Sequence, residues 1–150
     1  MTSQLHDFIS KQKSTEFATK NGLAMHAKLQ FVRMGNTPTG DAELIKRIES
    51  CGDELKSFFG ENSRSEVPIA GIVNGKFISR RIDRLVVDDV SKTVRILDYK
   101  TDIDTNKFRD KYIAQIHEYV GLLQQIYPEY KISGHILWLH DWTLDGIINA

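Results

Sequence analysis

Asp98 and Lys100 are the two residues whose types and spacing most directly suggest chemistry. They follow Val94, Ile96 and Leu97, an apolar run rich in β-branched residues that predicts the end of a buried strand. Side chains two residues apart on a strand project to the same side, so the carboxylate and the amine would lie a few ångströms apart. Such a pair can hold a cation and polarise a water molecule. An exposed Asp/Lys pair at a strand end is the alternative interpretation.

A second acid, Asp83, lies on what is also expected to be a strand, and it favours a functional role for the pair. The dipeptide Asn74-Gly75 predicts a two-residue hairpin loop, which places Glu66 opposite Asp83. A turn centred on Val90-Ser91 would likewise place Asp83 opposite Asp98. The three carboxylates would then form one row across three adjacent strands. A row of like charges requires a cation or a lysine over it.

Hydrophobic periodicity predicts the elements that position these residues. Apolar residues recur at helical spacing near the start of the chain, change to a spacing of two in its middle, and return to helical spacing before a final apolar run. In order, we expect a helix over 21–34, a helix capped by Asp41 that runs towards Cys51, a short helical piece that ends near residue 60, strands over 65–73, 76–87 and 93–99, a helix from Asn106 to Tyr127, and a strand over 132–139.

These elements predict an α/β fold with a mixed central sheet. The first three strands are joined by short turns and form an antiparallel meander. A crossover helix then returns the chain to the sheet, so the last strand is expected to lie parallel to a neighbour. Helices would cover both faces of the sheet.

Composition indicates one globular domain. The chain has 150 residues, of which 41% are hydrophobic and 27% are charged. Its formal net charge is zero, which counts against a passive DNA-binding module because such modules usually carry excess basic charge. The single cysteine, Cys51, excludes an internal disulfide and a four-cysteine iron–sulfur cluster. No apolar run approaches 18 residues, so we expect a cytoplasmic protein that does not enter the membrane. Residues 1–19 are expected to form a flexible lead-in.

The pattern of Asp83 followed by Asp98-Tyr99-Lys100 resembles the signature of PD-(D/E)XK nucleases. More narrowly, residues 20–150 are similar to the nuclease domain at the C-terminal end of AddA, the helicase-nuclease subunit of bacterial double-strand-break repair. Four further segments carry this resemblance, and their order and spacing span nearly the whole chain: Gly22-Leu23-Ala24-Met25-His26, Ser65-Glu66-Val67-Pro68-Ile69, Gln115-Ile116-His117-Glu118-Tyr119 and Leu137-Trp138-Leu139.

The resemblance implies a restriction-endonuclease-like core and a metal-dependent deoxyribonuclease or exonuclease. It implies that His26, Asp83, Asp98 and the backbone carbonyl of Tyr99 bind Mg²⁺, with Mn²⁺ tolerated. Lys100 would orient and polarise the attacking water molecule, and Glu66 would hold Lys100 or approach a second cation. Some related exonucleases carry an iron–sulfur cluster, but the single cysteine excludes one here.

The resemblance also implies partners. The substrate would be single-stranded DNA, delivered by an ATP-dependent helicase motor on the same parent chain, of which this sequence would be a fragment. A second subunit of the AddB type would complete the assembly, which would act in repair and recombination. The expected substrate-binding residues lie on the long helix: Gln115, Tyr119, Lys107, Arg109 and Lys111.

Several alternatives remain open on the residues alone. His26 lies among apolar residues at helical spacing, so it could be a half-buried histidine bonded to a backbone carbonyl. Relatives tend to have a glycine three residues before the first acid, where this chain has Arg80, so the local backbone or the approach of DNA would differ. The whole domain could be a catalytically silent DNA-end or subunit-docking domain, or a hydrolase of small phosphate esters with a closed pocket.

Overall fold

The computed structural model describes residues 22–103 and 105–148, so the expected lead-in over 1–19 lies outside the described residues. It has an α/β fold built around a five-stranded mixed sheet. The elements, in chain order, are a helix over 22–29, α2 (Ala42–Ser50), α3 (Asp53–Ser57), β1 (Ser63–Val73), β2 (Lys76–Asp88), β3 (Thr93–Lys100), α4 (Thr105–Ile126), β4 (Lys131–Trp138) and β5 (Thr143–Ile148).

The strands are arranged in the sheet in the same order as in the chain, from β1 to β5. The β1, β2 and β3 strands form an antiparallel meander, as predicted. The β3 and β4 strands are parallel, which confirms the expectation drawn from the crossover helix between them. The β5 strand is antiparallel to β4 and was not predicted. The meander therefore occupies one half of the sheet, and β3 joins it to the β4–β5 half.

Two short turns fix the register of the meander. Asn74 and Gly75 have φ values of 52° and 76°, the left-handed conformation that a two-residue hairpin loop requires, and Val73 pairs with Lys76 beside them. At the second turn, the Asp88 carboxylate accepts hydrogen bonds from the backbone N–H groups of Val90 and Ser91, and Asp88 pairs with Thr93. Both registers are those predicted from the sequence.

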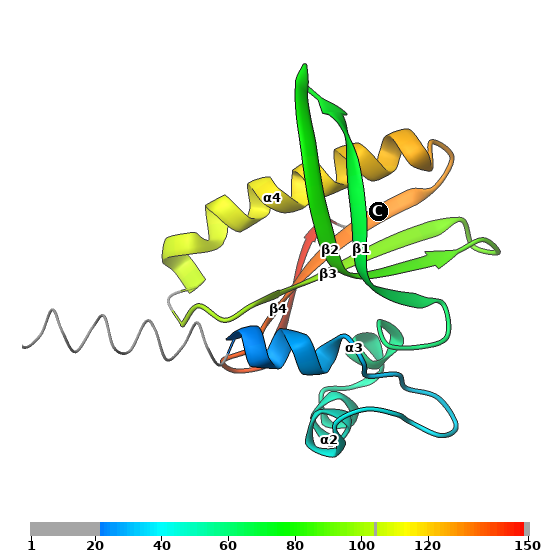
Figure 1. The fold of residues 1–150 in the computed structure, drawn as a ribbon, viewed down its shortest axis with the longest axis vertical. Coiled ribbons are helices and arrows are strands. Elements are labelled where there is room, and N and C mark those ends of the chain that lie inside the picture. The colour runs from blue at the N-terminus through cyan, green and yellow to red at the C-terminus, as the bar shows by residue number, and fades with distance from the viewer. Residues whose placement is uncertain (1–21, 104, 149–150) are drawn as a thin grey trace, which may run out of the picture.

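The sheet has a hydrophobic core on each face (Figure 1). On one face, α4 packs through Ile116, Leu122 and Leu123 against inward side chains of the strands. On the other, the helix over 22–29, α2 and α3 pack against a second cluster that includes Leu97 and Leu137. The helices thus lie on both faces, and each face has its own buried cluster. In Figure 1 the β1–β2 hairpin extends beyond the rest of the sheet.

The α2 helix begins as predicted. The Asp41 carboxylate accepts hydrogen bonds from the N–H groups of Glu43 and Leu44, both at 3.1 Å, and so caps the first turn. Leu44 and Ile48 are buried against the core. Cys51 is exposed just beyond the last turn.

The first helix is shorter than predicted. It ends at residue 29 rather than near Met34, because the chain turns and Arg33 pairs with Thr39 in an isolated antiparallel bridge. Phe31, which lies within the predicted helix, is 69% exposed. The turn places Leu29 and Val32 in the core instead.

The α4 helix packs closely on β4. A Cβ atom added at Gly134 would lie 2.4 Å from Cγ2 of Ile116, so only glycine allows the helix to approach this strand so closely. The helix begins at Thr105, one residue before the predicted cap Asn106, and ends at Ile126, before Pro128. Tyr119, which was expected to bind substrate, instead belongs to the buried apolar face of this helix.

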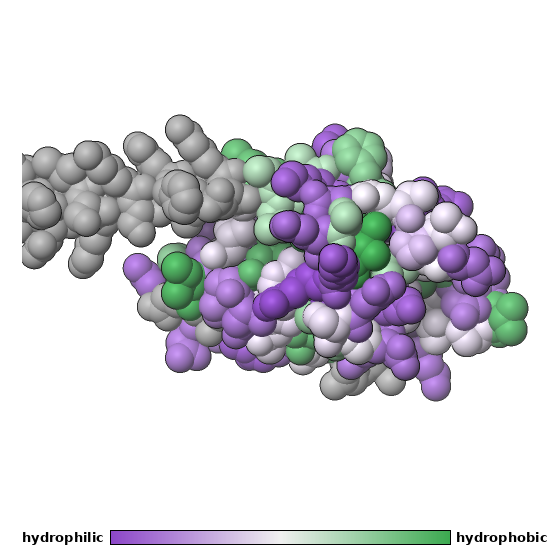
Figure 2. Space-filling model, turned by 90° about the horizontal axis from the view of Figure 1, so that it is seen from below, coloured by the Kyte–Doolittle hydropathy of each residue, from purple (hydrophilic) through white to green (hydrophobic). Residues whose placement is uncertain are grey.

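The surface is largely polar. Figure 2 shows one face of the molecule, on which hydrophilic residues predominate and hydrophobic side chains are scattered. Over the described ranges, the helices are too short or too polar to span a lipid bilayer.

Candidate functional site

The site lies where β2 and β3 separate. Their paired residues end at Arg84 and Leu97, one step before Asp83 and Asp98. Beyond this point the Asp83 side chain takes the place of a strand partner, since its Oδ2 accepts a hydrogen bond from the Tyr99 N–H at 2.8 Å. The separation of the strands thus leaves two carboxyl groups side by side, with one of them anchored to the β3 backbone.

Glu66 lies opposite Asp83 on β1, in the predicted register. Residues on both sides of it pair with β2, but Glu66 itself is absent from the ladder and has a left-handed φ of 54°. A glutamate rarely adopts this conformation, so the backbone of β1 is strained at the level of the site. The Glu66 carboxylate lies 3.8 Å from a guanidinium nitrogen of Arg81 and close enough to Asp83 to raise its pKa.

Asp83 and Asp98 are an electrostatically unfavourable pair in the absence of a cation. Burial, and next to it the charge of Asp98, raises the pKa of the Asp83 carboxyl to about 8, although the hydrogen bond from Tyr99 acts in the opposite direction. Asp98 is itself 3% exposed. The largely buried Asp83 carboxyl therefore holds its proton at neutral pH when no cation is present.

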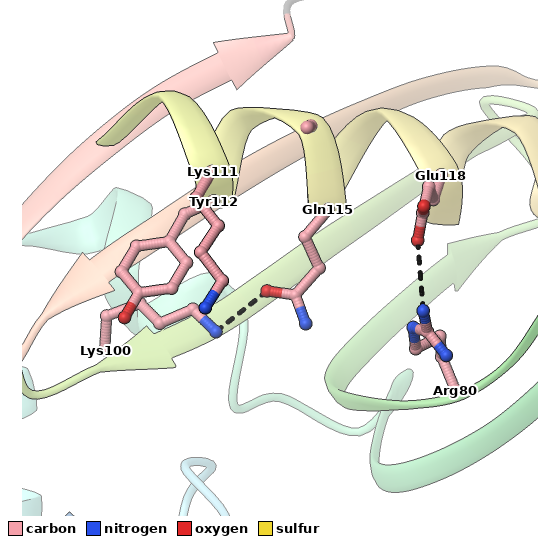
Figure 3. Close-up of a pocket in the computed structure, with 7 residues that line it drawn as sticks. Arg80, Lys100, Lys111, Tyr112, Gln115 and Glu118 are labelled. Carbon is pink, nitrogen blue, oxygen red and sulfur yellow. Dashed lines mark hydrogen bonds and ion pairs between the residues drawn. The ribbon is translucent and has the colours of Figure 1, made fainter. Parts of the chain in front are cut away.

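Lys100 is held in a fixed position over this pair. Its Nζ lies 2.9 Å from Asp98 Oδ2 and donates a hydrogen bond of 2.9 Å to Gln115 Oε1 (Figure 3). It also lies 4.3 Å from the centroid of the Tyr112 ring, a cation–π contact. Gln115 in turn donates a hydrogen bond of 2.8 Å to the Tyr119 hydroxyl. Tyr119 is 2% exposed and is therefore placed to orient Gln115 rather than to touch a substrate.

His26 reaches the same site from the first helix. Its Nε2 lies 3.2 Å from the backbone carbonyl oxygen of Tyr99 and 3.9 Å from Asp83 Oδ2. A hydrogen bond to a backbone carbonyl is what the alternative interpretation, a half-buried histidine, predicts for His26. However, the resemblance implies that this same Tyr99 carbonyl is a metal ligand. The imidazole, the carbonyl and the Asp83 carboxylate are therefore brought together.

Arg84 is a supporting residue that the sequence analysis missed. Its side chain is buried at 1% exposure and lies 4.5 Å from the centroid of the Phe59 ring. It donates hydrogen bonds to Tyr99 Oη at 3.3 Å and to Ser63 Oγ at 3.1 Å. It also donates to three backbone carbonyls just after the first helix: Leu29 at 2.7 Å, Gln30 at 3.3 Å and Val32 at 2.6 Å. Arg84 thereby fixes the helix that carries His26 to the strand that carries Tyr99. An arginine among the apolar residues Ile82, Leu85 and Val86 was the available signal.

The donors at the site suit a divalent cation in chemistry but do not converge on one. In the described part of the chain, no three His, Cys, Asp or Glu side chains converge on one point as a metal site. The chemistry of the donors nevertheless fits a hard cation. Asp98 Oδ2 is buried, and although Lys100 approaches it as an ion pair, no donor meets it with hydrogen-bond geometry. A cation would also relieve the repulsion between Asp83 and Asp98.

The basic residues of α4 are not all available to a ligand. Arg109 is bonded to Asp145 of β5 through two nitrogen atoms, each at 3.2 Å, and the same carboxylate accepts from the Trp138 indole at 3.2 Å. Lys107 lies 5.2 Å from the centroid of the Phe108 ring, near the start of the helix. Lys111 instead lines a pocket beside Lys100 (Figure 3). The structure thus brings Lys111 to the site and directs Arg109 to β5.

We expect Asp83→Asn to stabilise the metal-free chain at pH 8. A carboxyl group whose pKa is raised on folding stabilises the fold below its ordinary value near 3.8, and this contribution is lost as pH rises towards about 8. An asparagine removes the charge and can still accept the Tyr99 N–H. Thermal unfolding in EDTA should therefore show a variant with a higher Tm than the parent at pH 8 and a smaller difference near pH 4. Added Mg²⁺ should raise the Tm of the parent and not that of Asp83→Asn.

The matched control for this prediction is Asp110→Asn, which removes an exposed carboxylate from α4. It should change the Tm little at either pH. An Asp83→Asn variant with a lower Tm than the parent at pH 8 would contradict the prediction.

Comparison with known proteins gives no further guide to this site: neither a protein-family model nor a curated protein matches the sequence.

Proposed function

We propose that the chain is a metal-dependent nuclease that hydrolyses phosphodiester bonds in single-stranded DNA. The observation that supports this most is the Asp83–Asp98 pair, buried and adjacent, with the Lys100 ammonium fixed 2.9 Å from Asp98. A phosphodiester is anionic and has a poor leaving group, so its hydrolysis needs a cation on the phosphoryl oxygens and an activated water molecule. A carboxylate pair and a lysine on one face are suited to both needs.

In this proposal each residue has a defined part. Four groups would hold Mg²⁺ or Mn²⁺: Asp83, Asp98, the Tyr99 carbonyl and His26. Arg84 would keep Tyr99 and the helix that carries His26 in place. When bound, the cation supplies charge neutralisation of the phosphoryl group and a more acidic water molecule. Lys100, oriented by Asp98 and Gln115, would donate a hydrogen bond to the attacking water and so direct its lone pair to phosphorus. Glu66 lies at the rim, where a second cation would be nearest.

The topology supports the proposal independently of the side chains. The order of a helix, an antiparallel meander, a crossover helix and a strand parallel to β3 is the order expected for a restriction-endonuclease-like core. The resemblance to AddA-type nuclease domains would make this chain a fragment of a cytoplasmic helicase-nuclease. Its motor domains and an AddB-type subunit would then supply the unwound strand during double-strand-break repair.

A catalytically silent domain of the same fold is the second candidate. The observation that favours it is the contact between His26 Nε2 and the Tyr99 carbonyl, together with the lack of a converged metal site over the described ranges. Such a domain would bind DNA ends or a partner subunit without cleaving. The intact Asp83, Asp98 and Lys100 weigh against it, since these groups destabilise a buried site that has no chemical use for them.

Incubation of the chain with a labelled single-stranded oligonucleotide tests the proposal directly. Cleavage should require Mg²⁺ or Mn²⁺, stop on addition of EDTA, and disappear in Asp98→Asn. Binding without cleavage in either metal would support the silent domain. Cleavage of p-nitrophenyl phosphate, a monoester, without cleavage of DNA would instead support a small-ester hydrolase.

A further inference from the structure

A pocket of about 450 Å³ opens beside Lys100, between β2 and α4 (Figure 3). Three basic side chains line it: Arg80 from β2, Lys100 from β3 and Lys111 from α4. The remaining lining residues are Tyr112, Ala114, Gln115 and Glu118, all from α4. The pocket therefore includes Lys100, the candidate catalytic lysine, and extends from it to Arg80, which stands where the resemblance implies a glycine.

The charges in this pocket are not balanced. Lys100 is paired with Asp98, as described above. Arg80 lies 3.6 Å from Glu118 Oε2, an ion pair too long to be a hydrogen bond, and its guanidinium donates a hydrogen bond of 2.9 Å to the backbone oxygen of the adjacent Ser79. Lys111 has no ion pair with any residue that the structure describes. The pocket thus presents an uncompensated ammonium and a loosely held guanidinium.

The nature and placement of these two cations indicate the chemistry of the ligand. Figure 3 shows the Lys111 amine beside Lys100 and the Arg80 guanidinium beside Glu118, with Gln115 between them, so the two cations can donate to different phosphates of one strand. The pocket is larger than a single phosphate, and the aromatic ring of Tyr112 and the methyl group of Ala114 on its wall suit a sugar. A nucleic-acid strand whose scissile phosphate lies at Lys100 would place its next phosphate within this pocket, because the two lie on one continuous surface.

We propose that Arg80 and Lys111 form a phosphate-binding subsite, in which each cation holds a backbone phosphate of single-stranded DNA beyond the one at Lys100. The identity of the ligand rests on the proposed function. Glu118 competes with that phosphate for Arg80, so it weakens binding at the subsite. Arg80 thereby acquires a part that the glycine of relatives could not perform.

Fluorescence anisotropy of a labelled single-stranded oligonucleotide in EDTA tests the subsite without requiring cleavage. Arg80→Ala and Lys111→Ala should each weaken binding by about 3–10-fold. Each should also reduce the slope of log affinity against log salt by about 0.7, the value for one lost phosphate contact on a single strand. Glu118→Gln should act in the opposite direction and strengthen binding, because it releases Arg80 and removes a negative charge from the pocket.

Arg33→Ala and Lys46→Ala are matched controls, since each removes an exposed cation. Lys46 lies on α2, which covers the face of the sheet opposite α4, and Arg33 lies in the segment that precedes α2. They should leave affinity and salt slope near those of the parent. Parent-like values in Arg80→Ala and Lys111→Ala, or no binding by the parent, would overturn the subsite. If the variants weaken binding as expected but the parent cleaves nothing in Mg²⁺ or Mn²⁺, the subsite stands and the nuclease proposal fails.

Discussion

Lys100→Ala is expected to slow cleavage of single-stranded DNA by about 10²–10⁴-fold, the range for loss of a positioned acid–base group. The lysine is held by Asp98, by Gln115 and over the Tyr112 ring, whereas Lys111, which lines the same pocket, is exposed and forms no ion pair with Asp98. The variant should keep its metal ligands and bind Mn²⁺ at least as tightly as the parent. Single-turnover cleavage rates and calorimetric titration with Mn²⁺ measure the two effects separately.

Asp98→Asn should lose both DNA cleavage and tight binding of Mn²⁺. It removes a buried carboxylate that serves as a ligand and as the partner of Lys100, so Mn²⁺ affinity should fall together with the cleavage rate. Far-ultraviolet circular dichroism should show that both variants remain folded, because neither side chain belongs to the hydrophobic clusters. Equal affinity for Mn²⁺ in Lys100→Ala and Asp98→Asn would contradict this division of roles. Lys46→Ala is the control for loss of a lysine remote from the site.

Arg84→Met is expected to lower the free energy of unfolding by about 3 kcal/mol or more. Methionine fills much of the same volume but leaves the buried carbonyl oxygen of Val32 without its donor and removes the partner of the buried Ser63 and Tyr99 hydroxyls, whereas the Leu29 carbonyl keeps the Val32 N–H. Each unsatisfied buried polar group costs about 1–3 kcal/mol. For a chain of this size the loss corresponds to a fall in Tm of roughly 6–12 °C. Thermal and urea unfolding followed by circular dichroism would measure it.

Two further variants separate the geometry of Arg84 from its charge. Arg84→Lys keeps the charge but cannot reach Tyr99, Ser63 and the helix carbonyls at once, so its loss of stability should be intermediate. Arg33→Met, at an exposed arginine, should change stability by no more than about 0.5 kcal/mol. An Arg84→Met variant as stable as Arg33→Met would show that the buried guanidinium contributes nothing net to the fold.

The meander could be predicted from the sequence because its turns are short and chemically specific. Asn74-Gly75 permits one loop geometry, and Asp88 closes the second turn with its own side chain, so the register of β2 against both neighbours follows from local residues. That register is sufficient to bring Asp83 and Asp98 together. The parallel pairing of β4 with β3 followed from the intervening helix in the same way.

The remainder depended on tertiary contacts that leave a weak local signal. The β5 strand has the short sequence Thr143–Ile148 with a central glycine, and it is a strand because β4 offers it an edge. The first helix stops at residue 29, where the chain turns and Arg84 binds the carbonyls of Leu29 and Val32, a contact between residues more than fifty positions apart. Likewise, Tyr119 was expected to bind substrate, because its burial depends on the packing of α4 against the sheet and leaves no local signal.

The parallel pairing of β3 and β4 also determines how vulnerable the chain is while it folds. The meander forms through short loops, but β4 reaches β3 only after α4 has been made and docked, so this step carries the larger loop-closure entropy. Until then β3 is an unprotected edge strand with Val94, Ile96 and Leu97 in sequence, and such an edge can pair with another chain. A polypeptide truncated after Ile126 would keep that edge permanently and should aggregate. The pairing of β4 with β3 therefore protects the domain from aggregation once folding is complete.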